Sequence, residues 1–231
     1  MGNTEFVGFG HDAVSWFEGL EQDNSKEYFT ATRNQWETQI RDPLTALLHD
    51  LSLEFGGTVR VFRQNRDVRF SPDKSPYKLT TYGTLERSDA VAGLYAEISK
   101  LGLYAGTGYH ELARDQLERF RAAVLDEASG AALADLLASL TAAGLEPLLM
   151  LAPLKTVPRG YPHDHARVAL LRQKDLIMGK HMPPSAALAS RAAREHVAWV
   201  WHTAAPLNAW LDQHVGASSI PPEVRYGRGQ A

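Results

Sequence analysis

The sequence has 231 residues, a formal net charge of -3, 44% hydrophobic residues and no cysteine. This length suits one large domain, or a domain with a helical appendage, and the apolar fraction is sufficient for a hydrophobic core. The lack of cysteine excludes disulfides, thiolate catalysis and cysteine-ligated zinc or iron–sulfur sites, and it is consistent with a reducing compartment.

No basic segment followed by an apolar run opens the sequence, and no run of about 18 apolar residues is long enough to cross a bilayer. We therefore expect a soluble, cytoplasmic protein without membrane association. The net charge argues against extensive coating of nucleic acid. The sequence identifies no cofactor, and it leaves the oligomeric state open.

The first third of the chain predicts helices. Asp12 is placed to cap a short helix, and Asn24 with Glu27 forms a capping box for the next one. Pro43 is expected to break or restart that second helix, because an interior proline removes a backbone hydrogen bond. Leucines then recur at helical spacing up to Phe55, and the aromatic residues of these helices are expected to be core.

The middle of the chain changes to the period of two that is typical of strands. Four strands are predicted at residues 58–62, 80–86, 94–100 and 103–110, and their short connections favour antiparallel pairing. A further edge strand is predicted within residues 146–157, which contain two prolines. Helices are predicted at 112–126, at 130–143 with Gly144 ending the second, and in two pieces from 185 to 216.

These elements predict an α+β fold. A central antiparallel sheet of about four to five strands is expected, with helices from the N-terminal and C-terminal thirds packed on it. Residues 1–216 are expected to form a single domain, and residues 217–231 a flexible tail. Gly102, Gly106 and Gly108 lie within a strand pattern, so we expect a bulge, or a backbone that approaches a ligand closely, rather than a nucleotide-binding loop.

The most informative stretch is the arginine segment, residues 63–78. Six Lys or Arg residues and two acids lie between residues 60 and 78, whereas the first 50 residues carry nine acids and three Lys or Arg residues. In an extended chain Asp67 and Arg69 would share one face, with Val68 and Phe70 on the buried one. A bulge at residues 64–65 is the alternative, and residues 71–74 are expected to form a turn.

Arginine matches the paired oxygens of phosphate or carboxylate, and lysine adds a point charge. The segment therefore predicts an anion site formed by Arg63, Arg66, Arg69, Lys74, Tyr77 and Lys78, in which Tyr77 supplies a phenol. The competing interpretation is a structural network in which the arginines pair with Asp67, Asp73 and the acids of the first helices. Tyr95, Tyr104 and Tyr109 could line the same sheet face, although core or edge packing is favoured for them.

A second basic segment covers residues 155–180, with six Lys or Arg residues against two acids. If it converges with the arginine segment, the two form one cationic cleft, to which this segment would add Arg159, Tyr161, Arg172 and Lys174. His163, Asp164 and His165 are weak metal candidates, because they provide too few ligands at a suitable spacing. Ordinary loop hydrogen bonding, or His165 acting as a general acid or base held by Asp164, is favoured over a metal.

The arginine segment also carries a resemblance. The chain resembles a widespread bacterial family of conserved hypothetical proteins of about this length, in the pattern Arg63-x-x-Arg66-Asp67-x-Arg69-Phe70-x-x-x-Lys74-x-x-Tyr77. The similarity covers residues 5–216, and the chain departs from the family pattern at Ala166 and Ala169. The resemblance implies one intact domain and supplies no chemistry, because members of the family have no assigned function.

Three functional hypotheses follow. The favoured one is binding of a small anionic ligand in an Arg/Lys-rich cleft. Turnover of this ligand is left open, and in it Asp67, Tyr77 or His165 would move a proton. The second is non-catalytic binding of a nucleotide, a nucleic-acid backbone or an acidic protein. The third is an ion-pair network without a ligand. Whether the protein is an enzyme stays open.

Overall fold

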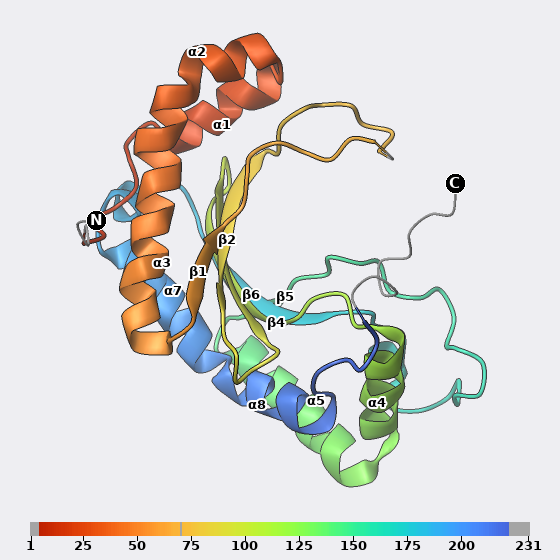
Figure 1. The fold of residues 1–231 in the computed structure, drawn as a ribbon. Helices are drawn as coiled ribbons and strands as arrows, with labels where there is room; N and C mark the ends of the chain where they lie inside the picture. Colours follow the sequence, from red (N-terminus) through yellow and green to blue (C-terminus); the bar gives the residue numbers. More distant parts are fainter. Residues whose placement is uncertain (1–4, 70, 222–231) are drawn as a thin grey trace. The chain divides into compact units, whose positions relative to one another are not determined.

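The protein has an α+β fold around one open antiparallel sheet (Figure 1). We describe it from a computed structural model, which covers residues 5–69 and 71–221. The sheet has six strands in the order β1-β2-β3-β4-β6-β5. Their bounds are β1 Thr58–Val61, β2 Thr80–Glu86, β3 Gly93–Ser99, β4 Gly102–Tyr109, β5 Glu146–Pro147 and β6 Leu176–Met182. The predicted fold class is confirmed, but the expected count of four to five strands was too low.

The extra strand is β6, which the sequence pattern did not indicate. Its first four residues are all buried, so the alternation of polar and apolar residues that marks a half-exposed strand is missing. The edge strand expected within residues 146–157 is much shorter than predicted, since β5 consists of Glu146 and Pro147. The four strands predicted between residues 58 and 110 agree with β1 to β4 within one residue at each end.

The helices cover both ends of the chain. They are α1 Ala13–Gln22, α2 Lys26–Trp36, the π-helix η1 Glu37–Arg41, α3 Asp42–Phe55, α4 Arg114–Leu125, α5 Glu127–Ala142, α6 Val168–Leu171, the 3-10 helix η2 Ala186–Ala189, α7 Ala192–Thr203 and α8 Ala205–His214. Pro43 stands in the first turn of α3, directly after the π-helix, so the predicted restart is confirmed. None of the helices among the described residues has the length and apolar character needed to cross a membrane.

The predicted capping box of α2 was wrong. The residue that caps α2 is Ser25, whose hydroxyl accepts a hydrogen bond of 3.0 Å from the backbone N–H of Tyr28. Asn24 is left free for a different role, which is described below with the candidate site.

The contacts divide the chain into two compact units. Unit 1 comprises Met1–Ser88, Leu94–Gly106 and Lys180–Trp201, and unit 2 comprises Asp89–Gly93, Thr107–Gly179 and His202–Ala231. The single domain expected over residues 1–216 stays a prediction. Part of the expected flexible tail, residues 222–231, lies outside the described residues. Within unit 2, the hydroxyl groups of Ser218 and Ser219 donate to Asp115 on α4.

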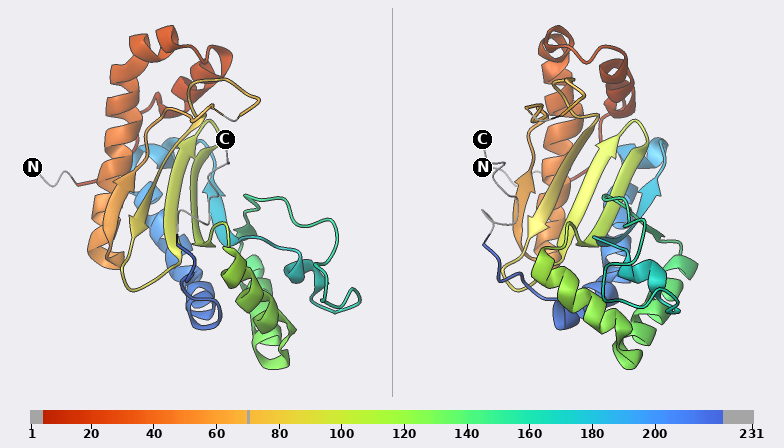
Figure 2. Two further views of the ribbon diagram at one scale, coloured as in Figure 1. Left: turned by 45° about the vertical axis from the view of Figure 1, so that its right-hand side comes forward. Right: turned by 90° about the vertical axis from the view of Figure 1, so that its right-hand side faces the viewer.

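In unit 1, helices α3 and α7 lie along the same face of strands β1 to β3 (Figures 1 and 2). The leucines of α3 at 44, 47, 48 and 51 are buried there. Gly83 on β2 permits this close approach, because a Cβ atom at that position would lie 2.5 Å from Cδ1 of Leu48. None of the helices described for unit 1 lies over the opposite face of these strands (Figure 2).

In unit 2, helices α4, α5 and α8 pack on one another around buried Phe120, Leu133 and Leu211. Tyr109 belongs to this unit, and its hydroxyl donates to Asp212 over 2.7 Å. Gly108 has a positive φ of 140°, and a Cβ atom there would lie 2.1 Å from the carbonyl oxygen of Leu176 on β6. The neighbour of this glycine is therefore the adjacent strand, and the expected close approach to a ligand stays a prediction.

Candidate functional site

The arginine segment forms a long loop between β1 and β2 (Figures 1 and 2). Strand β1 ends at Val61, and the expected strand through Asp67 and Arg69 is not formed. The two arms of the loop instead meet at an isolated antiparallel bridge between Asn65 and Tyr77. Beside this bridge, the N–H of Lys78 donates to the carbonyl oxygen of Gln64 over 2.9 Å. Phe70, predicted to be buried, lies outside the described residues.

Asn24 holds the base of this loop. Its side-chain oxygen accepts from the N–H of Tyr77 over 3.0 Å, and its side-chain nitrogen donates to the Tyr77 carbonyl over 3.1 Å. The Tyr77 ring is buried and stacks on Phe29 with 4.2 Å between ring centroids. The loop base is therefore fixed to the helical part of unit 1 by both hydrogen bonds and ring packing.

A buried hydrogen-bond chain fixes the other arm. The indole N–H of Trp36 donates to the Thr81 hydroxyl over 2.9 Å, and that hydroxyl donates to the side-chain oxygen of Gln64 over 2.8 Å. The amide nitrogen of Gln64 donates in turn to the carbonyl oxygen of Lys78. Because Gln64 is only 2% exposed, this chain satisfies polar groups that could not easily reach water.

The cations at the tip of the loop are bound within the loop itself. Arg66 forms an ion pair with Asp73, and Arg69 forms one with Asp67. The ammonium group of Lys74 donates to the carbonyl oxygen of Val68 over 2.9 Å. These contacts are those of the structural network that was the competing interpretation of the sequence.

The same ion pairs define the acidity of the two carboxylates. Hydrogen bonds from Arg69 lower the pKa of Asp67 to about 2, and bonds from Ser75 and then Arg66 hold the pKa of Asp73 below its ordinary value. A carboxylate with such a low pKa accepts protons poorly near neutral pH. This argues against Asp67 as the group that moves a proton.

Lys78 and Arg63 at the base of the loop differ from the cations at its tip in their partners. The ammonium group of Lys78 donates to the carbonyl oxygen of Arg63 over 2.6 Å and lies 4.8 Å from the centroid of the Tyr82 ring. Within the part of the chain that the structure describes, neither Lys78 nor Arg63 forms an ion pair with a carboxylate. Burial, and secondly the charge of Arg63, lower the pKa of Lys78.

Beside these cations lies a row of rings that we call the aromatic face, formed by Phe62, Tyr82, Tyr95, Tyr104 and His181. Successive ring centroids are 4.7, 5.6, 6.3 and 4.8 Å apart. All five residues belong to unit 1, and the row crosses strands β2, β3, β4 and β6. Because residues two apart on a strand share a face, the face also carries Glu97 next to Tyr95.

Glu97 is the carboxylate of the aromatic face. It accepts a hydrogen bond from the Tyr95 hydroxyl, and it lies directly opposite Tyr82 in the register of β2 and β3. Burial raises the pKa of Glu97, and it raises the pKa of Tyr95 as well. The face thus combines stacked rings, a half-buried carboxyl group and, at its edge, the cations of Lys78 and Arg63.

The predicted residues of the second basic segment lie in unit 2. Arg159 is exposed, and Arg172 donates from Nε to the carbonyl oxygen of Leu154. The Tyr161 ring lies 5.7 Å from the guanidinium carbon of Arg121, a buried cation that the sequence did not single out. Lys174 contributes its carbonyl oxygen, which accepts from the N–H of Leu112 over 2.9 Å. The convergence of the two basic segments stays a prediction.

The histidines of this segment show only local contacts. His163 and Asp164 are exposed, and Nδ1 of His165 accepts from the backbone N–H of Arg167 over 3.1 Å. Among the described residues there is no group of three or more His, Asp or Glu side chains that could hold a metal ion.

The comparison with protein families matches the model described as "Conserved hypothetical protein (DUF2461)" to residues 12–210. The chain belongs to DUF2461. This confirms the predicted resemblance to a conserved hypothetical family, while the sequence pattern proposed as its signature stays untested. No curated protein and no solved structure matches the chain.

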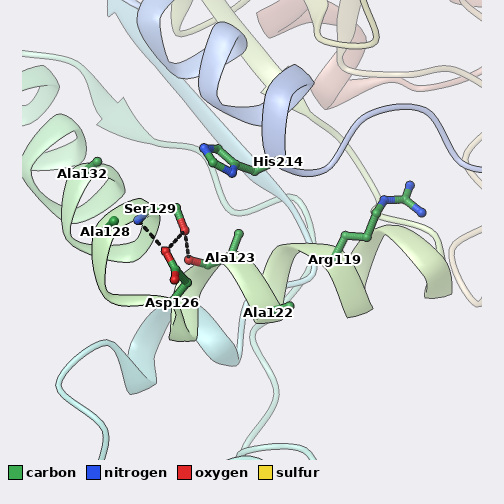
Figure 3. Close-up of a pocket in the computed structure, with 8 residues that line it drawn as sticks. All are labelled: Arg119, Ala122, Ala123, Asp126, Ala128, Ser129, Ala132 and His214. Atoms are coloured by element: carbon green, nitrogen blue, oxygen red, sulfur yellow. Dashed lines mark hydrogen bonds between the residues drawn. The ribbon is translucent and has the colours of Figure 1, made fainter.

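The DUF2461 chain also has a groove of about 640 Å³ in unit 2 (Figure 3). Alanines from α4 and α5 line much of it, with Arg119 and His214 at its sides (Figure 3). The carboxylate in the groove is Asp126, which accepts hydrogen bonds from the backbone N–H of Ser129 over 2.9 Å and from its hydroxyl over 2.8 Å. Asp126 therefore caps the start of α5. No residue of the predicted anion site lines this groove.

Sequence reasoning missed four members of the aromatic face of this DUF2461 protein, which are Phe62, Tyr82, Glu97 and His181. The signal for Tyr82 and Glu97 was present, because the alternating patterns of β2 and β3 place Tyr82, Tyr95 and Glu97 on the face away from the buried leucines. His181 had no such signal, because its strand was not predicted.

Proposed function

We propose that unit 1 of this DUF2461 chain binds a small molecule that carries an acidic group and a ring. The acidic group lies against Lys78 and Arg63, and the ring stacks on the aromatic face beginning at Tyr82. The observation that carries this proposal is the Lys78 ammonium group, 4.8 Å from the Tyr82 ring centroid and without a carboxylate partner among the described residues.

Charge supports this placement. Lys78 and Arg63 repel each other, which contributes to the lowered pKa of Lys78. A phosphate or carboxylate between them would relieve that repulsion and accept hydrogen bonds from both side chains. The arginines at the loop tip should attract an anion more weakly, because Arg66 is already paired with Asp73 and Arg69 with Asp67.

A long polyanion is the less favoured partner. Binding a nucleic-acid backbone requires several unpaired cations spaced along a track, since affinity grows with the number of phosphates that are neutralised. Ion pairs within the loop remove Arg66 and Arg69 from that count. We therefore favour a ligand with a single acidic group.

The test compares an acid with its neutral analogue. Para-methylbenzoate and para-methylbenzyl alcohol share a ring and differ in charge, and fragments of this size bind in about the millimolar range. In an NMR titration, para-methylbenzoate should shift the resonances of Tyr82, Tyr95 and Lys78 in a saturable manner, and the alcohol should bind much more weakly. Equal binding of the two probes, or shifts confined to the loop tip, would reject the proposal.

A further inference from the structure

Glu97 is a half-buried carboxyl group without a lysine or arginine partner among the described residues. Its one hydrogen bond among these residues comes from the Tyr95 hydroxyl. Burial raises the pKa of Glu97 and the charge of His181 acts to lower it, but no lysine or arginine of the described chain lies within ion-pair distance of it, whereas Glu86 on β2 is paired with Arg60.

This arrangement is unusual on physical grounds. Removing a carboxylate from water without a matching positive charge costs free energy, so buried acids in proteins are normally paired. The raised pKa of Glu97 reflects this cost, which burial causes and which the Tyr95 hydrogen bond and the charge of His181 only partly offset. A half-buried group that is unfavourable for the isolated protein is a candidate for a ligand contact.

The surroundings of Glu97 favour a cation. Tyr82 lies opposite it on β2, Tyr95 is on its own strand, and Tyr104 on β4 continues the row. The faces of tyrosine rings attract ammonium groups, and the aromatic cages that bind amines combine such rings with a carboxylate. The chain already shows this preference at the edge of the face, where Lys78 lies over Tyr82.

We propose that Glu97 and the rings of Tyr82 and Tyr95 form a subsite for an ammonium group, so that the ligand of unit 1 is a small zwitterion. The subsite for the acidic end of this ligand is the one described under the proposed function, on which this inference rests. The subsite for the ammonium end is new. Because Tyr82 lies between Lys78 and Glu97, the two charges of the ligand are separated by about the width of a ring. An ω-amino acid or an aminomethyl-substituted aromatic acid has this spacing, whereas an α-amino acid is too short.

The test uses three probes that share one ring. Para-aminomethylbenzoate carries both charges, para-methylbenzoate only the acid, and para-methylbenzylamine only the amine. Wild-type protein should bind para-aminomethylbenzoate about tenfold more tightly than para-methylbenzoate. In Glu97→Gln this preference should fall to about twofold or less, while binding of para-methylbenzoate is retained. Glu27→Gln, an exposed change on α2, is the control and should keep the full preference.

The outcomes separate the two proposals. If para-methylbenzoate fails to bind while para-methylbenzylamine binds in a Glu97-dependent manner, the proposed function is wrong and the ammonium subsite stands. If para-methylbenzoate binds and the amino group adds nothing, or adds as much in Glu97→Gln as in wild type, the ammonium subsite is overturned. Binding of none of the probes rejects both.

A pH series gives an independent readout. The titratable side chains on this face are Glu97, Tyr82, Tyr95, Tyr104 and His181. Its edge carries the cations of Lys78, Arg63 and Arg60, and the guanidinium carbon of Arg60 lies 4.6 Å from the Phe62 ring centroid. Binding of an ammonium group favours the ionised form of Glu97, so the preference for para-aminomethylbenzoate should increase as the pH rises through the pKa of Glu97. In Glu97→Gln the preference should not change over that range, and a wild-type preference that is equally flat would contradict the subsite.

Discussion

Replacing Asn24 with alanine tests whether the loop base is built as described. In the bridge between Asn65 and Tyr77, the neighbouring backbone groups pair across the two arms, and the N–H and carbonyl of Tyr77 itself bond to the Asn24 side chain at 3.0 and 3.1 Å. Each such bond contributes about 1 kcal/mol net, so Asn24→Ala should lower the free energy of unfolding by about 2 kcal/mol.

The assay is urea unfolding followed by tryptophan fluorescence, together with tryptic digestion of the loop. Loss of the two bonds should also free the loop base, so cleavage after Lys78 and at the arginines of the segment should become faster. Asn34→Ala is the matched control, because Asn34 is exposed on α2, and it should change stability by no more than about 0.5 kcal/mol. A loss below about 0.5 kcal/mol in Asn24→Ala, with an unchanged digestion pattern, would refute the reasoning.

Two further predictions concern the sheet of unit 1. Gly83→Ala should lower stability by about 1–3 kcal/mol, because the new methyl group would lie 2.5 Å from Leu48, whereas Gly93→Ala, with open space around it, should be nearly neutral in the same urea experiment. Burial raises the folded-state pKa of Glu97, so its stabilising contribution is complete below the unfolded pKa and is lost as the pH rises through the folded one. Glu97→Gln should therefore become increasingly more stable than wild type as the pH rises from the unfolded-state pKa of Glu97 through its higher folded-state pKa, and a constant difference in melting temperature would contradict this.

The sequence predicted β2 and β3 well because one face of each strand is buried and the other is not, and it predicted β4 although all of its residues are buried. Strands β1 to β4 alternate or carry aromatic and β-branched residues, which are direct signals of a pleated surface. Strand β6 is buried along its first four residues, and an apolar run of that kind has no period to detect. The register that brings His181 beside Tyr104 is a long-range contact, and no local pattern encodes it.

The candidate site shows the same limit. The sequence identified the arginine segment and both of its carboxylates, but the pairing of Arg66 with Asp73 and of Arg69 with Asp67 depends on the path of the loop. Asn24 fits a capping box by sequence, yet its side chain bonds to a residue 53 positions later, and Ser25 takes the cap. Local motifs compete with tertiary contacts for the same polar side chain, and here the tertiary contact prevails.

The central claim is that the cations at the loop base, rather than those at its tip, hold an acidic ligand beside the aromatic face. Titration of para-methylbenzoate into wild type, Lys78→Met and Arg69→Met tests it most directly, because methionine keeps an unbranched apolar stem and removes the charge. We predict that Lys78→Met weakens binding about tenfold or more and that Arg69→Met leaves it within about twofold. Loss of binding in Arg69→Met with full binding in Lys78→Met would contradict the account.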